Sequence, residues 1–207
     1  MNRTTLGALA AGVIMGGGAM YSVTAQQDGQ AYEIDMDAMM EVWLEAGRPG
    51  PEHEEMAKSV GSFNAHGTMY MPDGSTSEWH GTVEKNAIFG GRYILEHYKV
   101  QDMGMFGEFE GYGVAGFNKA TGKYEQYWID SLSTMMLMSK GEKHGNKIVM
   151  YGSRTDPMSG ETQKTKSVTT INDDGTFVLD MYMVMPEGEM HEMTINHTPI
   201  AGDGDEH

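Results

Sequence analysis

The sequence predicts a mainly β protein: a closed antiparallel meander barrel of about ten strands, preceded by a short N-terminal helical segment. From Phe63 onward the apolar pattern changes from a helical period to a period of two, and turn signals recur at short intervals. The connections after Phe63 are too short for parallel crossovers, so sequential strands should pair antiparallel. Ten such strands exceed what an open twisted sheet holds comfortably, which favours a closed barrel.

The helical segment is expected to begin at Asp35, whose side chain can cap a helix. Apolar residues then recur at helical spacing at Met36, Met39, Met40, Trp43 and Leu44. The run 47–51, Gly-Arg-Pro-Gly-Pro, ends this helix, and Pro51 suits the first turn of a second short one. His53 in that first turn is expected to have a capping or surface role rather than to act as a general base.

The ten strands are expected where alternating apolar residues lie between turn residues such as Gly, Pro, Asn and Asp. They are 63–71, 76–89, 92–101, 106–117, 123–130, 134–141, 147–154, 161–171, 176–185 and 189–198. In the strand 176–185, Met181 and Met183 share a face with Phe177, whereas Asp180 and Tyr182 share the other. We therefore expect Met181 and Met183 to be buried.

The N-terminus has the pattern of an export signal. Arg3 supplies a positive start, an apolar run follows, and small residues precede a cleavage point after Ala25. We expect residues 1–25 to be a signal peptide and 26–35 a flexible leader, with export to the periplasm or the medium. The alternative is an uncleaved membrane anchor. A single barrel domain with its N-terminal helices should span 36–200, and 201–207 should be a disordered acidic tail.

Composition excludes several classes of partner and site. The 207 residues include 14 Lys and Arg against 30 Asp and Glu, a net charge of −16, so no cationic surface for nucleic acid is expected. The same acidity disfavours stable association with an anionic membrane once the signal is removed. The absence of cysteine excludes disulfides, thiolate metal sites and thiol nucleophiles. The sequence leaves the oligomeric state open.

Six motifs occur in an order and spacing that resemble one bacterial family. They are Pro49-Gly50-Pro51-Glu52-His53, Gly61 before an aromatic residue, Gly90-Gly91-Arg92-Tyr93, Phe109 to Asn118, Tyr127 to Ser131 with Thr134, and Asp156 to Gly160. The chain resembles the domain-of-unknown-function family DUF1579 over roughly residues 38–198. The resemblance implies a single calycin-like or nitrobindin-like barrel, and it supplies neither an activity nor a catalytic residue.

The candidate ligand site combines one charged pair with aromatic walls. Arg92 and Asp130 could anchor a polar ligand group, and Trp128 could provide a stacking wall. The structural alternative for this set is an ion pair beside a core tryptophan. Tyr98 and Tyr112 are further candidates for the lining of the same cavity, although aromatic residues are common in strands.

Methionine is abundant, with 21 residues in the chain, and it replaces leucine as the main core residue. Thioethers and imidazoles also suit Cu(I), so Met181, Met183, His191 and Met193 form an alternative metal site. If the hairpin between their strands has three loop residues, Met183 faces His191 and Met181 faces Met193. Core packing is the favoured interpretation of these residues.

Three functions follow from these features. The first is an exported barrel that holds a small, largely apolar molecule with one polar end. The second is an enzyme that uses the same cavity for acid–base chemistry with Asp130 as the base. The third is a periplasmic copper or haem carrier that uses Met and His. A binder needs only a cavity, an enzyme needs a titratable group in it, and a carrier needs converging ligands.

Overall fold

The computed structural model describes residues 23–27 and 30–201. Most of the predicted signal peptide and nearly all of the predicted acidic tail, residues 1–22 and 202–207, therefore lie outside the described residues. The chain divides into two compact units, Met1–Gly47 and Arg48–His207, which are described separately below. In the described segments no helix is long and apolar enough to cross a membrane.

The first unit contains a small hairpin and one helix. Strands β1 (Val23–Gln27) and β2 (Gln30–Ile34) pair antiparallel where the sequence predicted no strands: β1 spans the end of the predicted signal peptide and the start of the predicted flexible leader, and β2 lies in that leader. Helix α1 (Met36–Ala46) begins at the predicted cap, because Asp35 Oδ1 accepts a hydrogen bond of 3.0 Å from the Ala38 amide. This bond gives one of the unpaired first-turn N–H groups a partner.

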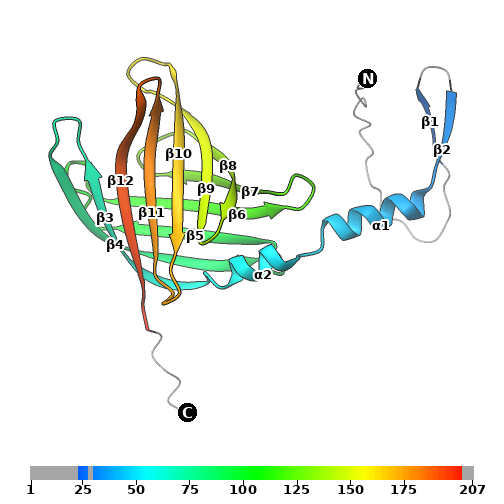
Figure 1. Ribbon diagram of the computed structural model, residues 1–207, viewed down its shortest axis with the longest axis horizontal. Coiled ribbons are helices and arrows are strands. Elements are labelled where there is room, and N and C mark those ends of the chain that lie inside the picture. The colour runs from blue at the N-terminus through cyan, green and yellow to red at the C-terminus, as the bar shows by residue number, and fades with distance from the viewer. Residues whose placement is uncertain (1–22, 28–29, 202–207) are drawn as a thin grey trace, which may run out of the picture. The chain divides into compact units, whose positions relative to one another are not determined.

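The second unit is a closed antiparallel barrel of ten strands, which confirms the predicted fold class (Figure 1). Its strands are β3 (Gly61–Tyr70), β4 (Thr76–Ile88), β5 (Tyr93–Val100), β6 (Phe109–Asn118), β7 (Lys123–Asp130), β8 (Leu137–His144), β9 (Lys147–Thr155), β10 (Thr162–Ile171), β11 (Phe177–Met185) and β12 (Gly188–Pro199). Each strand pairs with its neighbour in sequence. The last strand, β12, pairs with the first, β3, from Met193↔Met69 to Pro199↔Phe63, and so removes both sheet edges.

Two strands begin three residues later than the sequence predicted. Strand β6 begins at Phe109 rather than at residue 106, because Gly104–Phe106 forms a short 3-10 turn, η1. Strand β8 covers Leu137–His144 rather than 134–141, because its hairpin turn lies at Gly145. Gly145 has φ +62°, a conformation that glycine adopts readily and that a two-residue hairpin turn requires.

Helix α2 (Pro51–Ala57) lies against one end of the barrel, where it contacts β5 and β6 (Figure 1). His53 fixes the start of this helix: its Nδ1 accepts a 3.1 Å hydrogen bond from the Gly50 amide. The imidazole is buried, and its edge meets the ring of Phe117 at a centroid distance of 6.0 Å. The predicted capping role of His53 is confirmed, and the same side chain attaches α2 to the barrel wall.

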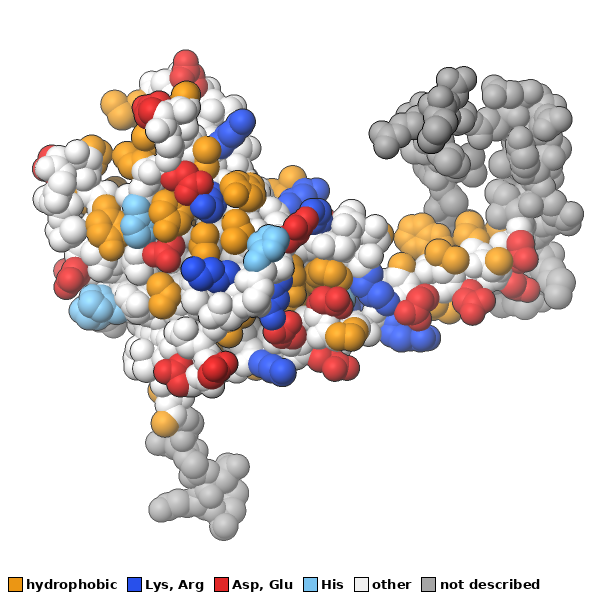
Figure 2. Space-filling model, in the orientation of Figure 1, with side chains coloured by type: hydrophobic (Ala, Val, Ile, Leu, Met, Phe, Trp, Pro, Cys, Tyr) orange, Lys and Arg blue, Asp and Glu red, His pale blue; other side chains and the backbone are white. Residues whose placement is uncertain are grey.

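The barrel interior has an apolar cluster at the end away from α2. Its buried members include Met69, Trp79, Val100 and Met103, and Trp128 packs against them. On the outside, acidic and basic side chains are interspersed with hydrophobic ones on the face shown in Figure 2. This arrangement follows from the alternation of strand residues between the interior and the solvent.

Candidate functional site

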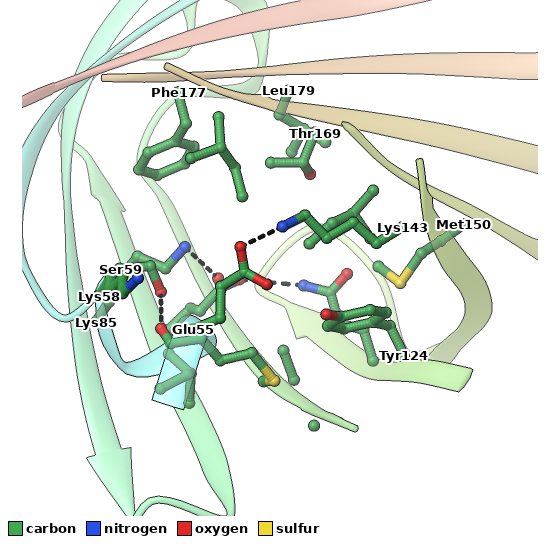
Figure 3. A pocket seen from close by; sticks show the side chains of 18 of the residues that line it. Glu55, Lys58, Ser59, Lys85, Tyr124, Lys143, Met150, Thr169, Phe177 and Leu179 are labelled. Atoms are coloured by element: carbon green, nitrogen blue, oxygen red, sulfur yellow. Dashed lines mark hydrogen bonds and ion pairs between the residues drawn. The ribbon is translucent and has the colours of Figure 1, made fainter. Parts of the chain in front are cut away.

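A cavity of about 490 Å³ occupies the interior at the end of the barrel that α2 covers. Residues of α2, of the inner faces of the strands, and of the loop between β10 and β11 line it. Its apolar walls come chiefly from Phe63, Ile94, Ala115, Ile148, Met150, Phe177 and Leu179. Figure 3 shows these walls surrounding a small number of polar side chains. A volume of this size is within the range of small-molecule sites.

One ion pair is buried in the cavity wall. Lys85 on β4 and Glu96 on β5 are direct cross-strand partners, and Lys85 Nζ lies 2.8 Å from Glu96 Oε1. Each residue is only 8% exposed. Gln126 Nε2 donates a 3.1 Å hydrogen bond to the other carboxylate oxygen, Glu96 Oε2. Lys85 Nζ also lies 4.3 Å from the centre of the Phe177 ring. Both charges therefore have hydrogen-bonding or ring partners, as buried charges must.

A glycine makes the contact between Glu96 and Gln126 possible. Gly113 on β6 lies directly opposite Glu96, and a Cβ there would be 3.0 Å from Glu96 Oε2 and 3.4 Å from Gln126 Nε2. Any larger residue would crowd the hydrogen bond. Glycine at this position thus leaves room for two polar side chains to meet over the strand between them.

Next to the ion pair lies a buried tyrosine–histidine contact. Tyr98 Oη is 2.8 Å from His197 Nε2, and His197 Nδ1 is 3.3 Å from the Phe177 carbonyl oxygen. A carbonyl can only accept, so Nδ1 carries the proton, and the Tyr98 hydroxyl donates to Nε2. Burial, together with the nearby Lys85 ammonium, lowers the pKa of His197 to about 3. Burial, reinforced by Glu96, raises the pKa of Tyr98 well above its ordinary value. Both groups are neutral near neutral pH.

A second ion pair connects α2 with the opposite wall. Lys143 on β8 donates to Glu55 on α2, and both residues line the cavity. Figure 3 shows the Glu55 carboxylate and the Lys143 ammonium pointing toward one another. Ser59, which follows α2, donates a 2.7 Å hydrogen bond to the Met56 carbonyl. The Ser59 bond stabilises the end of the helix, and the Glu55–Lys143 pair attaches α2 to β8 at this end of the cavity.

Of the predicted site residues, only Tyr98 lines the cavity. Trp128 faces the interior, but it packs with the apolar cluster, where its ring meets the edge of Tyr98 at 5.5 Å. Asp130 accepts a 2.9 Å hydrogen bond from Trp128 Nε1 and a 3.0 Å bond from the Leu132 amide. Trp128 and Asp130 therefore meet each other, but at the end of the barrel away from the cavity.

Arg92 does not reach this pair. It lies exposed in the turn before β5, where its Nη1 donates a 2.8 Å hydrogen bond to the Phe89 carbonyl. The register places Asp130 opposite Gly111, and Gly111 opposite Tyr98. Arg92 and Asp130 thus lie at opposite ends of the barrel, and the expected arginine–aspartate pair was wrong. The prediction included Arg92 in the alternation of the following strand, but Arg92 belongs to the turn before β5.

Tyr112 is on the outer face rather than in the cavity, which corrects its expected position. It stacks on His97 at a centroid distance of 4.1 Å, and its hydroxyl donates to Glu110. The inner face of this strand carries glycine, because a Cβ at Gly111 would lie 2.4 Å from the Trp128 ring. At this point of the strand the large residue is therefore outside and the small one inside, although Phe109 on the inner face packs against the interior cluster.

The alternative metal set is divided between two faces. A register shift between Met181 and Tyr182 places Met183 opposite Met190 and Tyr182 opposite His191, so the expected Met183–His191 pairing was wrong. The expected Met181–Met193 pairing is confirmed. Met181 and Met183 are half-buried rather than buried.

His191 belongs to an outer aromatic stack. It lies between Tyr70 and Tyr182 at centroid distances of 4.5 and 4.6 Å, and its Nε2 is 3.2 Å from Asp180 Oδ1. Met193, in contrast, packs against the interior cluster. Within the described residues no group of three or more His, Asp or Glu side chains is placed to hold a metal ion.

The polar residues of the cavity were not identified from the sequence, although a signal for two of them was present. Lys85 follows the buried Val83 by two positions, and Glu96 lies between the buried Ile94 and Tyr98, so both interrupt apolar faces. Counting outward from the Gly90-Gly91 turn places them opposite each other. For Glu55 and Lys143 no local signal exists, because they are 88 residues apart.

Comparison with known proteins agrees with this architecture. The structure is similar to the crystal structure of Rv2717c from M. tuberculosis, with a TM-score of 0.55 and 12% sequence identity over 74% of this chain and 100% of that one. At this identity the likeness concerns the fold alone. No curated protein matches the sequence. The family model described as protein of unknown function (DUF1579) matches residues 48–198, which include α2 and nearly all of the barrel. The chain therefore belongs to the DUF1579 family.

Proposed function

We propose that this protein binds a small, largely apolar molecule with one polar end inside its barrel. The observation that carries the proposal is the cavity of about 490 Å³, which has apolar walls and a polar cluster at Lys85, Glu96 and Gln126. Apolar surface supplies affinity, and a few fixed polar groups orient the ligand. The closed wall and the helix over one end also shield a bound molecule from water.

The two alternatives draw less support from the same cavity. For the enzyme, Asp130 was the expected base, but it lies away from the cavity and is hydrogen-bonded to Trp128 and Leu132. For the copper or haem carrier, the described lining residues include the thioethers Met56 and Met150 but no imidazole. The buried imidazole of His197, which contacts the lining residue Tyr98, uses Nε2 to accept from the Tyr98 hydroxyl.

Export belongs to the proposal as well. Its support is the sequence pattern alone: the positive start, the apolar run and the small residues that end at Ala25. A binder exported to the periplasm or the medium would carry or sequester molecules of low solubility. N-terminal sequencing of the mature protein tests this part, because cleavage after Ala25 predicts Gln26 as the first residue.

The binding function is tested by native mass spectrometry of the full chain purified from its own host. We expect a population whose mass exceeds that of the chain by one small organic molecule, which denaturation releases. The emptied protein should then bind the neutral apolar dye N-phenylnaphthylamine with saturable fluorescence. A protein that carries no such mass and gives no saturable dye binding would overturn the proposal.

A further inference from the structure

The buried charges of the cavity are balanced as a pair, because Lys85 and Glu96 neutralise each other in the wall. Lys143 and Glu55 form a second, less buried pair at α2, and the other charged lining residues, Lys58, Glu125 and Asp173, are exposed or half-buried. The first pair is the more deeply buried, with side chains 9% and 11% exposed. A charged ligand group placed beside it would have no opposite charge of its own, and an unpaired charge in an apolar cavity is strongly disfavoured.

The hydrogen-bonding capacity of the cluster, in contrast, is not exhausted. The Lys85 ammonium has three N–H donors, of which one points to Glu96 and another is placed over the Phe177 ring. Gln126 uses its nitrogen toward Glu96, and because a carboxylate only accepts, the amide orientation is fixed. The Gln126 oxygen accepts no hydrogen bond from any other described residue. One donor, at Lys85, and one acceptor, at Gln126, are therefore available next to the two oxygens of the Glu96 carboxylate.

From this arrangement we infer that the cavity selects ligands whose polar end is an uncharged group that both donates and accepts, an alcohol or a primary or secondary amide. The inference rests on the binding function proposed above. A hydroxyl can accept from Lys85 or donate to the Gln126 oxygen, and in either position the ion pair stays intact. A carboxylate would compete with Glu96 for Lys85, and an ammonium would compete with Lys85 for Glu96.

The position of the cluster gives the selection its geometry. Lys85, Glu96 and Gln126 lie on three strands, β4, β5 and β7, on one side of the interior. The wall formed by Ile148, Thr169 and Leu179 comes from β9, β10 and β11. An apolar chain can therefore lie along the second wall while its head group reaches the cluster.

The test is a competition experiment with the full chain near neutral pH. N-phenylnaphthylamine is displaced by decanol, decanoate or decylamine, three probes with the same chain and different head groups. We expect decanol to bind at least about tenfold more tightly than either charged probe. If the dye binds but decanoate or decylamine competes as well as decanol, the selection is refuted while the binding function stands. If the dye itself does not bind, the binding function fails.

Any apolar cavity disfavours a charged probe to some degree, so variants must show that the cluster is responsible. Glu96→Gln leaves Lys85 without its counter-charge, and we expect the ratio of decanol to decanoate affinity to fall at least about tenfold. Gln126→Leu retains the Lys85–Glu96 ion pair but removes the Gln126 acceptor. It should weaken the binding of decanol several-fold while the affinity for decanoate stays unchanged. The two variants change different groups. If Glu96→Gln does not fold, Gln126→Leu still tests the inference.

Thr169→Val is the matched control. Valine is similar in size to threonine, so this substitution removes one hydroxyl from the cavity lining and leaves the cluster of Lys85, Glu96 and Gln126 unchanged. We expect it to leave the order and the ratio of the three probes unchanged. If Glu96→Gln and Gln126→Leu leave the affinity ratios at the wild-type values, as Thr169→Val does, head-group selection does not come from this cluster and the inference is overturned.

Discussion

The two ends of the barrel interior have the same strand architecture but opposite contents. At the end away from α2, large aromatic side chains face glycines: a Cβ at Gly67 would lie 2.0 Å from the Trp79 ring, and one at Gly111 would lie 2.4 Å from Trp128. At the α2 end, residues such as Ala115, Thr169 and Leu179 leave a cavity of about 490 Å³. The difference shows that the position of the cavity depends on where tryptophan fills the barrel, not on the number of strands.

Polar groups follow the same division. The packed end holds mostly apolar side chains, with the Asp130 carboxylate near its rim. The cavity end holds the Lys85–Glu96 pair and the Glu55–Lys143 pair. Removing side chains from the packed end should therefore affect stability, whereas changes at the cavity end should affect binding.

The largest expected effect is at Trp79, which is 2% exposed in the packed end. Trp79→Ala should lower the free energy of unfolding by about 3–5 kcal/mol, because it removes a large apolar side chain and leaves a void. Urea unfolding measures this loss. Phe89→Ala is the control, since Phe89 is 74% exposed and should change stability little. Equal losses in the two variants would contradict the assignment of Trp79 to a packed core.

The next effect depends on pH and concerns His197. Its pKa is about 3 in the folded protein against 6.5 for the ordinary residue, so between these values the unfolded chain binds a proton that the folded one does not. Stability should therefore fall as the pH is lowered through 6.5 toward 3, by up to about 4 kcal/mol in total from this residue. Urea unfolding of wild type and His197→Gln at a series of pH values separates this contribution from that of the carboxylates. Parallel pH profiles for the two proteins would show that His197 is not buried in its neutral form.

A smaller effect is expected at Met183, which is half-buried in β11. Met183→Ala should cost about 1–2 kcal/mol, less than the 2–5 kcal/mol typical of a fully buried methionine. The measurement is urea unfolding with and without a copper chelator. A loss that appears only after chelation would indicate that metal binding, rather than packing, stabilises this face.

The smallest effect on stability is expected at Glu55, whose ion pair with Lys143 is partly exposed. Glu55→Gln should change the free energy of unfolding by less than about 1 kcal/mol. It should nevertheless speed dissociation of N-phenylnaphthylamine, measured by stopped-flow dilution, because α2 loses its contact with β8. The control Glu142→Gln breaks a comparable pair with Lys123, outside the cavity lining, and should leave the dissociation rate unchanged. Equal rates in Glu55→Gln and wild type would show that this ion pair does not control release.

The fold could be predicted from the sequence because its determinants are local. Alternation and turn residues identified all ten strands, and short connections required antiparallel neighbours. Even the cap at Asp35 and the role of His53 follow from residues within three positions. The largest errors in the strand boundaries arose at η1 and at the Gly145 turn.

The site could not be predicted to the same extent, because its determinants are contacts between distant strands. Alternation places Trp128 and Asp130 on one face of their strand, but it shows neither that this face is the inner one nor which end of the barrel Trp128 occupies. Nor does it show that Gly111 makes Tyr112 an outer residue, since that depends on the ring lying over the glycine. The bulge in β12, where Glu192 is the extra residue, changed the partner of His191 for the same reason: one shift in register changes which side chains meet.

The claim that the α2 end holds a ligand is tested most directly by filling that end. Ile148 on β9 lines the cavity, and Tyr151 on the same strand is 55% exposed. The measurement is equilibrium binding of N-phenylnaphthylamine to the wild type, Ile148→Trp and Tyr151→Trp, each verified as folded by circular dichroism. We predict saturable binding to the wild type and Tyr151→Trp, and at least about tenfold weaker binding to Ile148→Trp. Equal binding to all three proteins would place the dye outside the cavity and contradict the account.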